Sequence, residues 1–149
     1  MKVVFTEFDE LFLEYSWFWL NDPAIKRLLQ ADDFTQEDQR KWFESLKNRN
    51  DYLIWGIKLD TEPIGSCGLK SISANECEYW GYIGEKNYWG KGIGKIIMAY
   101  VEEKAIEKNL SSIWLKVTEA NVRAIGLYEK YGYIIEFKKN GMIKMRKVL

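Results

Sequence analysis

The spacing of apolar residues predicts helices in the first third of the chain. Between residues 11 and 29 apolar side chains recur at roughly helical intervals, and a turn signal at residues 21–23 interrupts them. Asp22 can cap a second helix, with the proline that follows at its first position. A third helix is expected to begin at Thr35, because Asp38 stands three residues later in an approximate capping box. Its expected inner face consists of Trp42, Phe43 and Leu46.

The middle of the chain predicts three strands joined by short turns. Residues 52–59, 64–72 and 76–83 carry the β-branched and aromatic residues that are typical of strands. Residues 60–63 are expected to form the turn between the first two strands. Three consecutive strands with short connections favour an antiparallel meander.

The final third alternates between helix and strand. Asn121 is expected to cap the second of two helices, and Asn140-Gly141 is typical of a tight hairpin turn between two closing strands. These elements are predicted at residues 92–108, 112–117, 121–131, 133–138 and 143–148.

The order of these elements predicts one α/β (α+β) domain over residues 1–149. Its mixed sheet would consist of the antiparallel meander, a βαβα segment and the closing hairpin. The length of 149 residues suits a single domain, for which roughly 100–200 residues are usual.

Charge and hydropathy narrow the classes of partner. The 22 basic and 22 acidic residues cancel, which argues against a general nucleic-acid binder and against a polybasic membrane anchor. No apolar run approaches the roughly 20 residues that span a bilayer, and no signal peptide follows Met1. We therefore expect a cytoplasmic protein with no nucleic-acid and no membrane partner.

The residue types narrow the chemistry further. The chain has no histidine, which excludes Ser-His-Asp and Cys-His catalysis and predicts that no metal is bound. Cys67 and Cys77 lack the spacing of a zinc or redox motif and are expected to be buried thiols. Seven tryptophans and nine tyrosines leave aromatic candidates for the lining of a pocket.

Three glycines alternate within residues 88–95, which read Tyr-Trp-Gly-Lys-Gly-Ile-Gly-Lys between a predicted strand and a predicted helix. Such glycines let the backbone pass close to a ligand and turn several N–H groups to one side. The helix that follows adds its positive N-terminal end, and Lys91 and Lys95 add charge. The segment predicts phosphate or pyrophosphate binding, with a turn that uses glycine for its geometry alone as the alternative. It matches neither a P-loop nor a complete dinucleotide fingerprint.

A second pattern occupies residues 121–133. Together with the glycine loop, it resembles the GNAT superfamily of acetyl-CoA-dependent N-acetyltransferases. The family's later pattern, Asn-x-x-Ala-x-x-Leu-Tyr-x-x-x-Gly-Phe, is filled here by Asn121, Ala124, Leu127, Tyr128, Gly132 and Tyr133. The family's cofactor motif, Arg/Gln-x-x-Gly-x-Gly/Ala, is filled by Trp89, Gly92 and Gly94, and Trp89 is its one departure. The Tyr-Trp-Gly-Lys-Gly loop is similar to the branch that contains the ribosomal-protein N-terminal acetyltransferases.

The resemblance implies that acetyl-CoA is the co-substrate. The loop would hold the pyrophosphate of CoA through Trp89, Gly90, Lys91, Gly92, Ile93, Gly94 and Lys95. The end of the preceding strand would bind the pantetheine arm and polarise the thioester carbonyl through Tyr82, Ile83 and Gly84. Asn121 would bind the arm from the other side.

Acetyl transfer to an amine also needs an acid for the departing thiolate and a base for the ammonium group. The resemblance makes Tyr128 the acid, since a phenol with a pKa of about 10 can protonate a thiolate of comparable basicity. Packing on an amphipathic helix is the alternative for this tyrosine. Glu78 is the predicted base, with Glu76 and Glu85 as alternatives and a solvent-facing carboxylate as the other interpretation. Some N-terminal acetylating relatives carry glutamate where this chain has Lys116.

The acceptor is expected over the first helices, at Trp17, Trp19, Asn21 and Trp42. Aromatic faces with short polar groups suit a sugar ring or a nucleotide base. A finer resemblance is to bacterial N-acetyltransferases that act on nucleotide-linked 4-amino-sugars. It is carried by residues 16–23, Thr35, Gln39, Trp42-Phe43, Trp55-Gly56 and Pro63-Ile64-Gly65. We therefore expect acetyl transfer to a primary amine of a small molecule such as a nucleotide-linked amino-sugar. A protein or peptide N-terminal acetyltransferase and a CoA-binding sensor without turnover are the alternatives, and a homodimer remains open.

Overall fold

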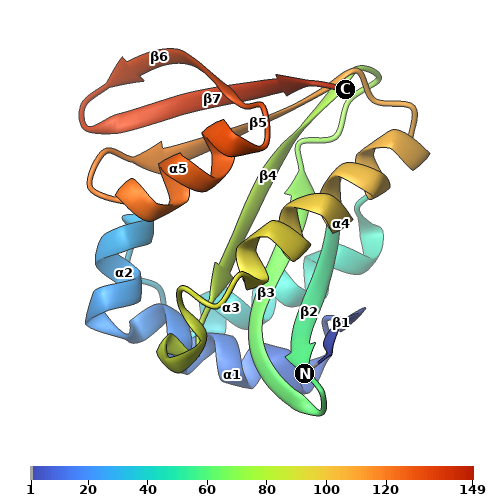
Figure 1. Cartoon of the computed structure of the whole chain (residues 1–149). Coiled ribbons are helices and arrows are strands. Elements are labelled where there is room, and N and C mark those ends of the chain that lie inside the picture. The colour runs from blue at the N-terminus through green and yellow to red at the C-terminus, as the bar shows by residue number, and fades with distance from the viewer. Residues whose placement is uncertain (1) are drawn as a thin grey trace.

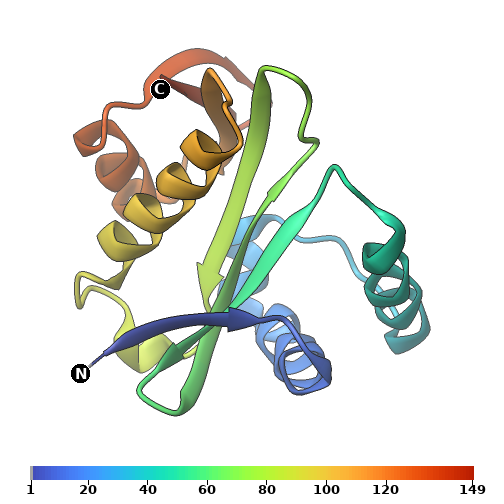
Figure 2. The same ribbon diagram turned by 90° about the vertical axis from the view of Figure 1, so that its right-hand side faces the viewer.

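A computed structural model describes residues 2–149 as one seven-stranded sheet with helices on both faces (Figures 1 and 2). The strand order is β1-β2-β3-β4-β5-β7-β6, and every neighbouring pair is antiparallel except the parallel pair β4–β5. The elements are β1 (Val3–Glu7), α1 (Glu10–Asn21), α2 (Pro23–Leu29), α3 (Gln36–Ser45), η1 (Leu46–Asn48), β2 (Leu53–Leu59), β3 (Glu62–Lys70), β4 (Glu76–Ile83), η2 (Lys86–Tyr88), α4 (Ile93–Glu107), β5 (Ser112–Thr118), α5 (Val122–Lys130), β6 (Ile134–Lys139) and β7 (Met142–Val148).

The predicted helix starts are confirmed by their caps. The Asp22 carboxylate accepts the backbone N–H of Ala24 at 2.9 Å, and α2 begins with the proline between them. Thr35 and Asp38 form a reciprocal capping box at the start of α3. The Asn121 side chain accepts the N–H of Ala124 at 3.3 Å and so starts α5.

The meander and the closing hairpin are also confirmed. Strands β2, β3 and β4 pair in order, and Asn140 and Gly141 both adopt positive φ between β6 and β7. The first turn is shorter than predicted. Asp60 adopts a φ of 56°, which closes the turn early, so Pro63 belongs to β3 and not to the turn.

Two features of the sheet were not predicted. The chain starts with an edge strand, β1, whose five residues pair with β2 from Val3 opposite Leu59 to Glu7 opposite Trp55. The last strand, β7, inserts between β5 and β6. Both are long-range pairings, which the local apolar pattern of these short segments does not specify.

The two faces of the sheet carry separate cores. Helices α4 and α5 cover one face, and α1, α2 and α3 lie over the other (Figure 2). Cys67 and Cys77 are free and buried in the larger core, as predicted. None of the helices within residues 2–149 is long and apolar enough to cross a bilayer.

Gly56 of β2 sets the distance between the sheet and α1. A Cβ atom at this position would overlap the ring of Phe12, a fully buried residue of α1. The missing side chain lets the Phe12 ring lie directly on the strand. This contact positions the helix that carries Ser16, one of the residues of the cavity described below.

We expect Gly56→Ala to lower the free energy of unfolding by about 1–3 kcal/mol, because the added methyl group overpacks a closed core. The measurement is urea unfolding followed by circular dichroism. Gly126→Ala is the matched control, since nothing lies within 4 Å of a Cβ at that helical position. It should leave stability unchanged or raise it by about 0.5–1 kcal/mol. Equal stability of Gly56→Ala and the native chain would contradict this account.

Candidate functional site

The sheet opens between β4 and β5. These parallel strands pair only from Glu76 opposite Ser112 to Glu78 opposite Trp114. Beyond this point β4 continues to Ile83 and β5 to Thr118, and the two strands diverge (Figure 1). At the wide end, the Thr118 hydroxyl donates to the Leu28 carbonyl at 3.3 Å, which ties the end of β5 to α2.

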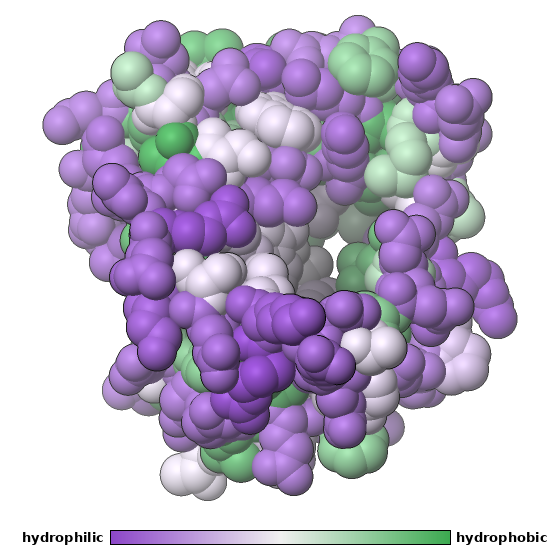
Figure 3. Space-filling view, turned by 180° about the vertical axis from the view of Figure 1, so that it is seen from behind, coloured by the Kyte–Doolittle hydropathy of each residue, from purple (hydrophilic) through white to green (hydrophobic). Residues whose placement is uncertain are grey.

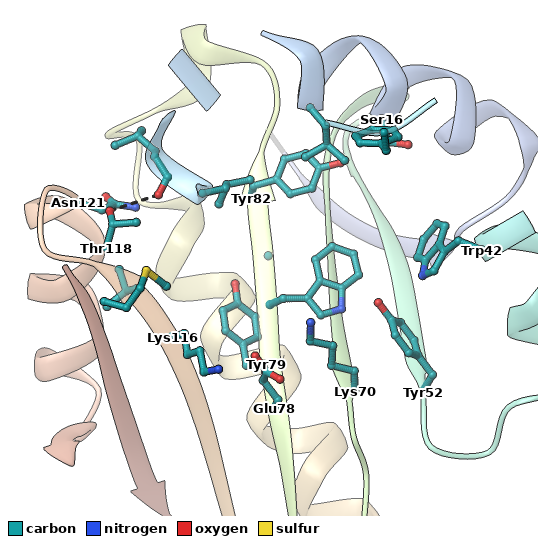
Figure 4. A pocket seen from close by; sticks show the side chains of 18 of the residues that line it. Ser16, Trp42, Tyr52, Lys70, Glu78, Tyr79, Tyr82, Lys116, Thr118 and Asn121 are labelled. Carbon is teal, nitrogen blue, oxygen red and sulfur yellow. Dashed lines mark hydrogen bonds between the residues drawn. The ribbon is translucent and has the colours of Figure 1, made fainter. Parts of the chain in front are cut away.

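A cavity of about 500 Å³ occupies this gap (Figures 3 and 4). Five consecutive β4 residues, 78–82, line it. The lining includes Tyr79 and Tyr128, which pack in the core under α4 and α5, and Trp42 and Tyr82, which pack against the core under α1, α2 and α3. The cavity therefore joins the α4–α5 side of the molecule to the α1–α3 side.

The gap exposes backbone groups of β4. The carbonyl of Asn75 accepts from Ser112 on the β5 side, and the N–H of Gly84 donates to Ile64 on the β3 side at 2.7 Å. Because backbone groups alternate in direction along a strand, the odd-numbered residues face β5. After the strands separate, Gly81 and Ile83 turn their N–H groups into the gap.

At the strand end, the prediction named Tyr82, Ile83 and Gly84 without choosing among their backbone groups. The Gly84 N–H donates to the Ile64 carbonyl and is therefore not free for a ligand. The Ile83 carbonyl accepts from the Trp89 indole at 2.8 Å, so only the N–H of Ile83 remains for a ligand. Sequence analysis missed Gly81, because its role depends on where β5 leaves β4.

Two phenols meet where the cavity crosses the sheet. Tyr79 of β4 and Tyr128 of α5 both line it, with ring centroids 6.2 Å apart and planes inclined at 73°. A Cβ atom on Gly81 would overlap the Tyr79 hydroxyl, so this glycine makes room for that group. Burial raises the pKa of Tyr128 to about 12 and the pKa of Tyr79 well above its ordinary value. Both rings therefore keep their protons at neutral pH.

The structure separates the three candidate bases. Glu76 forms an ion pair with Arg146 at 3.4 Å. Glu85 accepts the indole N–H of Trp19 at 2.9 Å and does not line the cavity. Glu78 lines the cavity and has no ion-pair partner within residues 2–149. Of the three candidates, Glu78 is thus the one that lines the cavity without an ion-pair partner among the described residues.

The glycine loop lies at the start of α4. Gly90 and Gly92 have φ of 73° and 81°, and Gly92 caps the helix without any side-chain hydrogen bond. The first turn of α4 contains no acidic residue, and no side chain caps its N–H groups, which have no partner within the helix. The exposed Lys91 and Lys95 stand beside them. This arrangement fits the phosphates of an anionic cofactor.

Three loop residues that were predicted to hold the pyrophosphate also make packing contacts or hydrogen bonds within the chain. The polar atom of Trp89 is engaged by the Ile83 carbonyl, and Ile93 packs into the core, so neither side chain is available to a phosphate. A Cβ atom on Gly94 would lie 2.8 Å from Leu127, so this glycine lets α4 approach α5. Sequence analysis missed Arg123, whose guanidinium carbon lies 3.8 Å from the place of a Cβ on Gly90. The feature of the sequence that could have indicated Arg123 as a phosphate contact is that it is a basic residue near the start of a predicted helix.

Of the four predicted acceptor residues, only Trp42 lines the cavity. Trp17 packs edge-on against Phe34, with centroids 5.3 Å apart. Trp19 is only 5% exposed, and the amide of Asn21 donates to the Trp17 carbonyl at 2.7 Å.

Tyr52, Trp80 and Gln39 were not predicted as site residues, but they line the cavity, whereas Trp17, Trp19 and Asn21 do not. A chain of rings runs along one wall of the cavity from Trp42 through Tyr52 and Trp80 to Tyr82, with successive centroids 6.3, 6.4 and 6.3 Å apart. The buried amide of Gln39 donates to the Ser16 hydroxyl at 2.8 Å and to the Leu13 carbonyl, which fixes its orientation beside this wall. Tyr82 and Asn121, both predicted to contact the cofactor, also line the cavity.

Comparison with curated proteins finds distant relatives. An uncharacterised protein of Methanocaldococcus jannaschii is 25% identical over 135 residues, which cover 89% of this chain but 28% of that relative. The chain therefore spans about a quarter of the length of this relative. The acetyltransferase PseH of Campylobacter jejuni is 26% identical over 133 residues, which cover 88% of this chain and 82% of PseH.

Solved structures show the same fold. A domain from Methanocaldococcus jannaschii superposes with a TM-score of 0.89 at 21% identity, covering 99% of both chains. Spermidine N-acetyltransferase from Vibrio cholerae, solved with CoA and spermine, has a TM-score of 0.85 at 18% identity and covers 98% of this chain and 95% of its own. PseH in complex with acetyl coenzyme A has a TM-score of 0.77 at 17% identity and covers 99% of both chains.

The family assignment rests on a match across most of the chain. Residues 14–133 match the acetyltransferase (GNAT) family, a span that contains both the glycine loop and the pattern that starts at Asn121. The resemblance on which the predicted site was built is thereby confirmed. The chain belongs to the acetyltransferase (GNAT) family.

Proposed function

We propose that this protein is an acetyl-CoA-dependent N-acetyltransferase that acts on a primary amine of a small molecule. The observation that carries the proposal is the gap between β4 and β5. It leads from the glycine-loop side of the sheet to a cavity lined by Glu78 and Tyr128. Two structural neighbours are described in complex with CoA or acetyl-CoA.

The residues at the gap fit acetyl-CoA. The free N–H groups of the α4 start, with Lys91, Lys95 and Arg123 nearby, match the charge of a pyrophosphate. The N–H groups of Gly81 and Ile83 match an extended arm that carries amides, which can lie along β4 as an added strand would. Asn121 also lines the cavity, and its side-chain NH2 is the donor that remains for a ligand, because its oxygen accepts from the α5 cap.

Different groups of the chain carry out the separate steps of the acetyl transfer. When bound, acetyl-CoA supplies an activated acetyl group. Glu78 accepts the proton that the ammonium group of the acceptor must lose before its nitrogen can attack. The N–H groups of β4 that face the gap stabilise negative charge on the carbonyl oxygen. Burial raises the pKa of Tyr128 to about 12, so the phenol is protonated at neutral pH and gives its proton to the departing sulfur.

A nucleotide-linked amino-sugar is the acceptor that we favour. The aromatic wall of Trp42, Tyr52 and Trp80 offers flat faces to a ring, and the first part of the chain resembles enzymes of that class. One structural neighbour is a spermidine N-acetyltransferase, so polyamines belong in the same test.

The first test is thiol release from acetyl-CoA with amino-sugar nucleotides, polyamines and short peptides as acceptors. Release with the amino-sugars alone is the expected result. Release with peptides alone would instead identify a protein N-terminal acetyltransferase. Tight acetyl-CoA binding without release for any amine would favour a sensor without turnover.

Gly92→Asp should weaken acetyl-CoA binding by at least about 100-fold, because it places a carboxylate where phosphate is expected. Isothermal titration calorimetry measures this affinity directly. Gly141→Asp is the matched control: it puts the same side chain at another glycine with positive φ, in the β6–β7 hairpin. Unchanged affinity in Gly92→Asp, or equal loss in both variants, would remove the loop assignment.

Tyr128→Phe should lower kcat by about 10²–10⁴-fold and change the acetyl-CoA dissociation constant only a few-fold, because only the proton donor is lost. Tyr133→Phe is the control, since Tyr133 is a buried phenol whose ring lies 5.9 Å from that of Tyr128 but does not line the cavity. Native turnover in Tyr128→Phe combined with slow turnover in Tyr79→Phe would transfer the acid role to Tyr79.

A further inference from the structure

Glu78 lies between two lysines on the acceptor side of the cavity (Figure 4). Lys70 of β3 stands directly opposite Glu78 of β4, and Glu78 stands opposite Trp114 of β5. Lys116 follows Trp114 by two residues and therefore shares its face of the sheet. All three charged side chains line the same cavity, with one lysine on each side of the gap.

Two other basic residues of this face, both on β7, have acidic partners. Arg146 pairs with Glu76 and Glu136, and Lys144 pairs with Glu136 at 3.4 Å. Neither Lys70 nor Lys116 forms an ion pair within residues 2–149. Glu78 is the one carboxylate between these two lysines, so the three side chains together carry a net positive charge.

The remaining acid of the cavity does not neutralise the lysines. The Asp38 carboxylate is held by the capping box, where it accepts the Thr35 N–H at 3.0 Å. Glu78 is needed for the amine if the proposed function holds. The cavity thus offers one carboxylate to a positive nitrogen and two ammonium groups to a negative group nearby.

The aromatic wall adds a second requirement on the acceptor. The Trp80 indole lies flat on β3, since a Cβ on Gly68 would meet its nitrogen at 2.7 Å. That nitrogen is buried and has no acceptor within residues 2–149. Tyr52 lies between Trp80 and Trp42, tilted by 55° to the first ring and edge-on to the second, and lines the same cavity. The wall therefore offers apolar faces against which a ring of the acceptor can pack.

We propose that Lys70 and Lys116 form a binding site for a phosphate or carboxylate group of the acceptor, on either side of the Glu78 that receives its amine. The proposal rests on the proposed acetyl transfer at this site and narrows its substrates to amines that carry a negative charge. A polyamine would place a second positive charge beside the two lysines and is disfavoured.

The test compares two matched pairs of amines on the CoA-saturated protein, so that the glycine loop is already filled. Glucosamine 6-phosphate is paired with glucosamine, and 4-aminobutyrate is paired with 1,4-diaminobutane. Titration calorimetry on the CoA-saturated protein measures binding, and thiol release with acetyl-CoA in place of CoA measures kcat and KM. We expect the anionic member of at least one pair to bind about tenfold or more tightly than its partner. Preference for the phosphate pair or the carboxylate pair identifies the anion.

Variants then assign the preference to the two lysines. Lys70→Met and Lys116→Met should each weaken binding of the preferred anionic amine by about five- to tenfold, raise its KM and leave kcat nearly unchanged. Binding of the uncharged or cationic partner should not weaken, and Lys116→Arg should restore affinity. Lys138→Met, at an exposed position of β6, is the control and should behave like the native chain.

Two outcomes would overturn the proposal. One is a native protein that binds no anionic amine better than its partner. The other is a preference that persists in the Lys70→Met, Lys116→Met double variant. If only the proposed acetyl transfer is wrong, the result is different. The anionic amine would still bind in a way that depends on the lysines, but no thiol would be released.

Discussion

Two parallel strands that share hydrogen bonds over only three residues must leave the rest of their facing edges without partners. In this chain the strands are β4 and β5, and the last shared pair is Glu78 opposite Trp114. Unpaired backbone N–H groups inside a protein are costly unless a ligand or water satisfies them. The opening therefore interrupts the sheet and leaves an edge of β4 at which a ligand can pair. The other features of the site lie around this opening.

The groups around the opening differ in charge from one end to the other. On the glycine-loop side, the uncapped start of α4 and its neighbouring basic residues favour a polyanion. Where the cavity crosses the sheet, Tyr79 and Tyr128 are buried and remain protonated. On the α1–α3 side, one free carboxylate stands between two free lysines. From one end of the opening to the other, these three environments suit an anionic acetyl donor, a reacting centre shielded from water and an acceptor with charges of both signs.

Several glycines matter in this fold because a side chain at their positions would overlap a neighbouring residue. Gly56 admits the Phe12 ring, Gly81 admits the Tyr79 hydroxyl and Gly94 lets α4 approach Leu127 of α5. Each contact moves an element of the site closer to the sheet than a side chain would allow. The loop glycines Gly90 and Gly92 differ from these, because their positive φ angles shape the backbone itself.

The sequence by itself determined the features that depend on neighbours along the chain. Asp22, the Thr35–Asp38 box and Asn121 cap the helices where predicted, and the meander, the Asn140-Gly141 turn and the glycine loop follow from equally local rules. Tyr128 and Glu78 were predicted from a family pattern and a strand position, and the structure places both at one cavity.

Only the tertiary structure decided which residues face one another across the sheet. The edge strand β1, the insertion of β7 beside β5 and the early separation of β5 from β4 are long-range pairings. These pairings bring Lys70, Trp80 and Lys116 to Glu78, while Trp19 is turned into the core. Because register between distant strands depends on the packing of the whole sheet, no local pattern of apolar and polar residues specifies it.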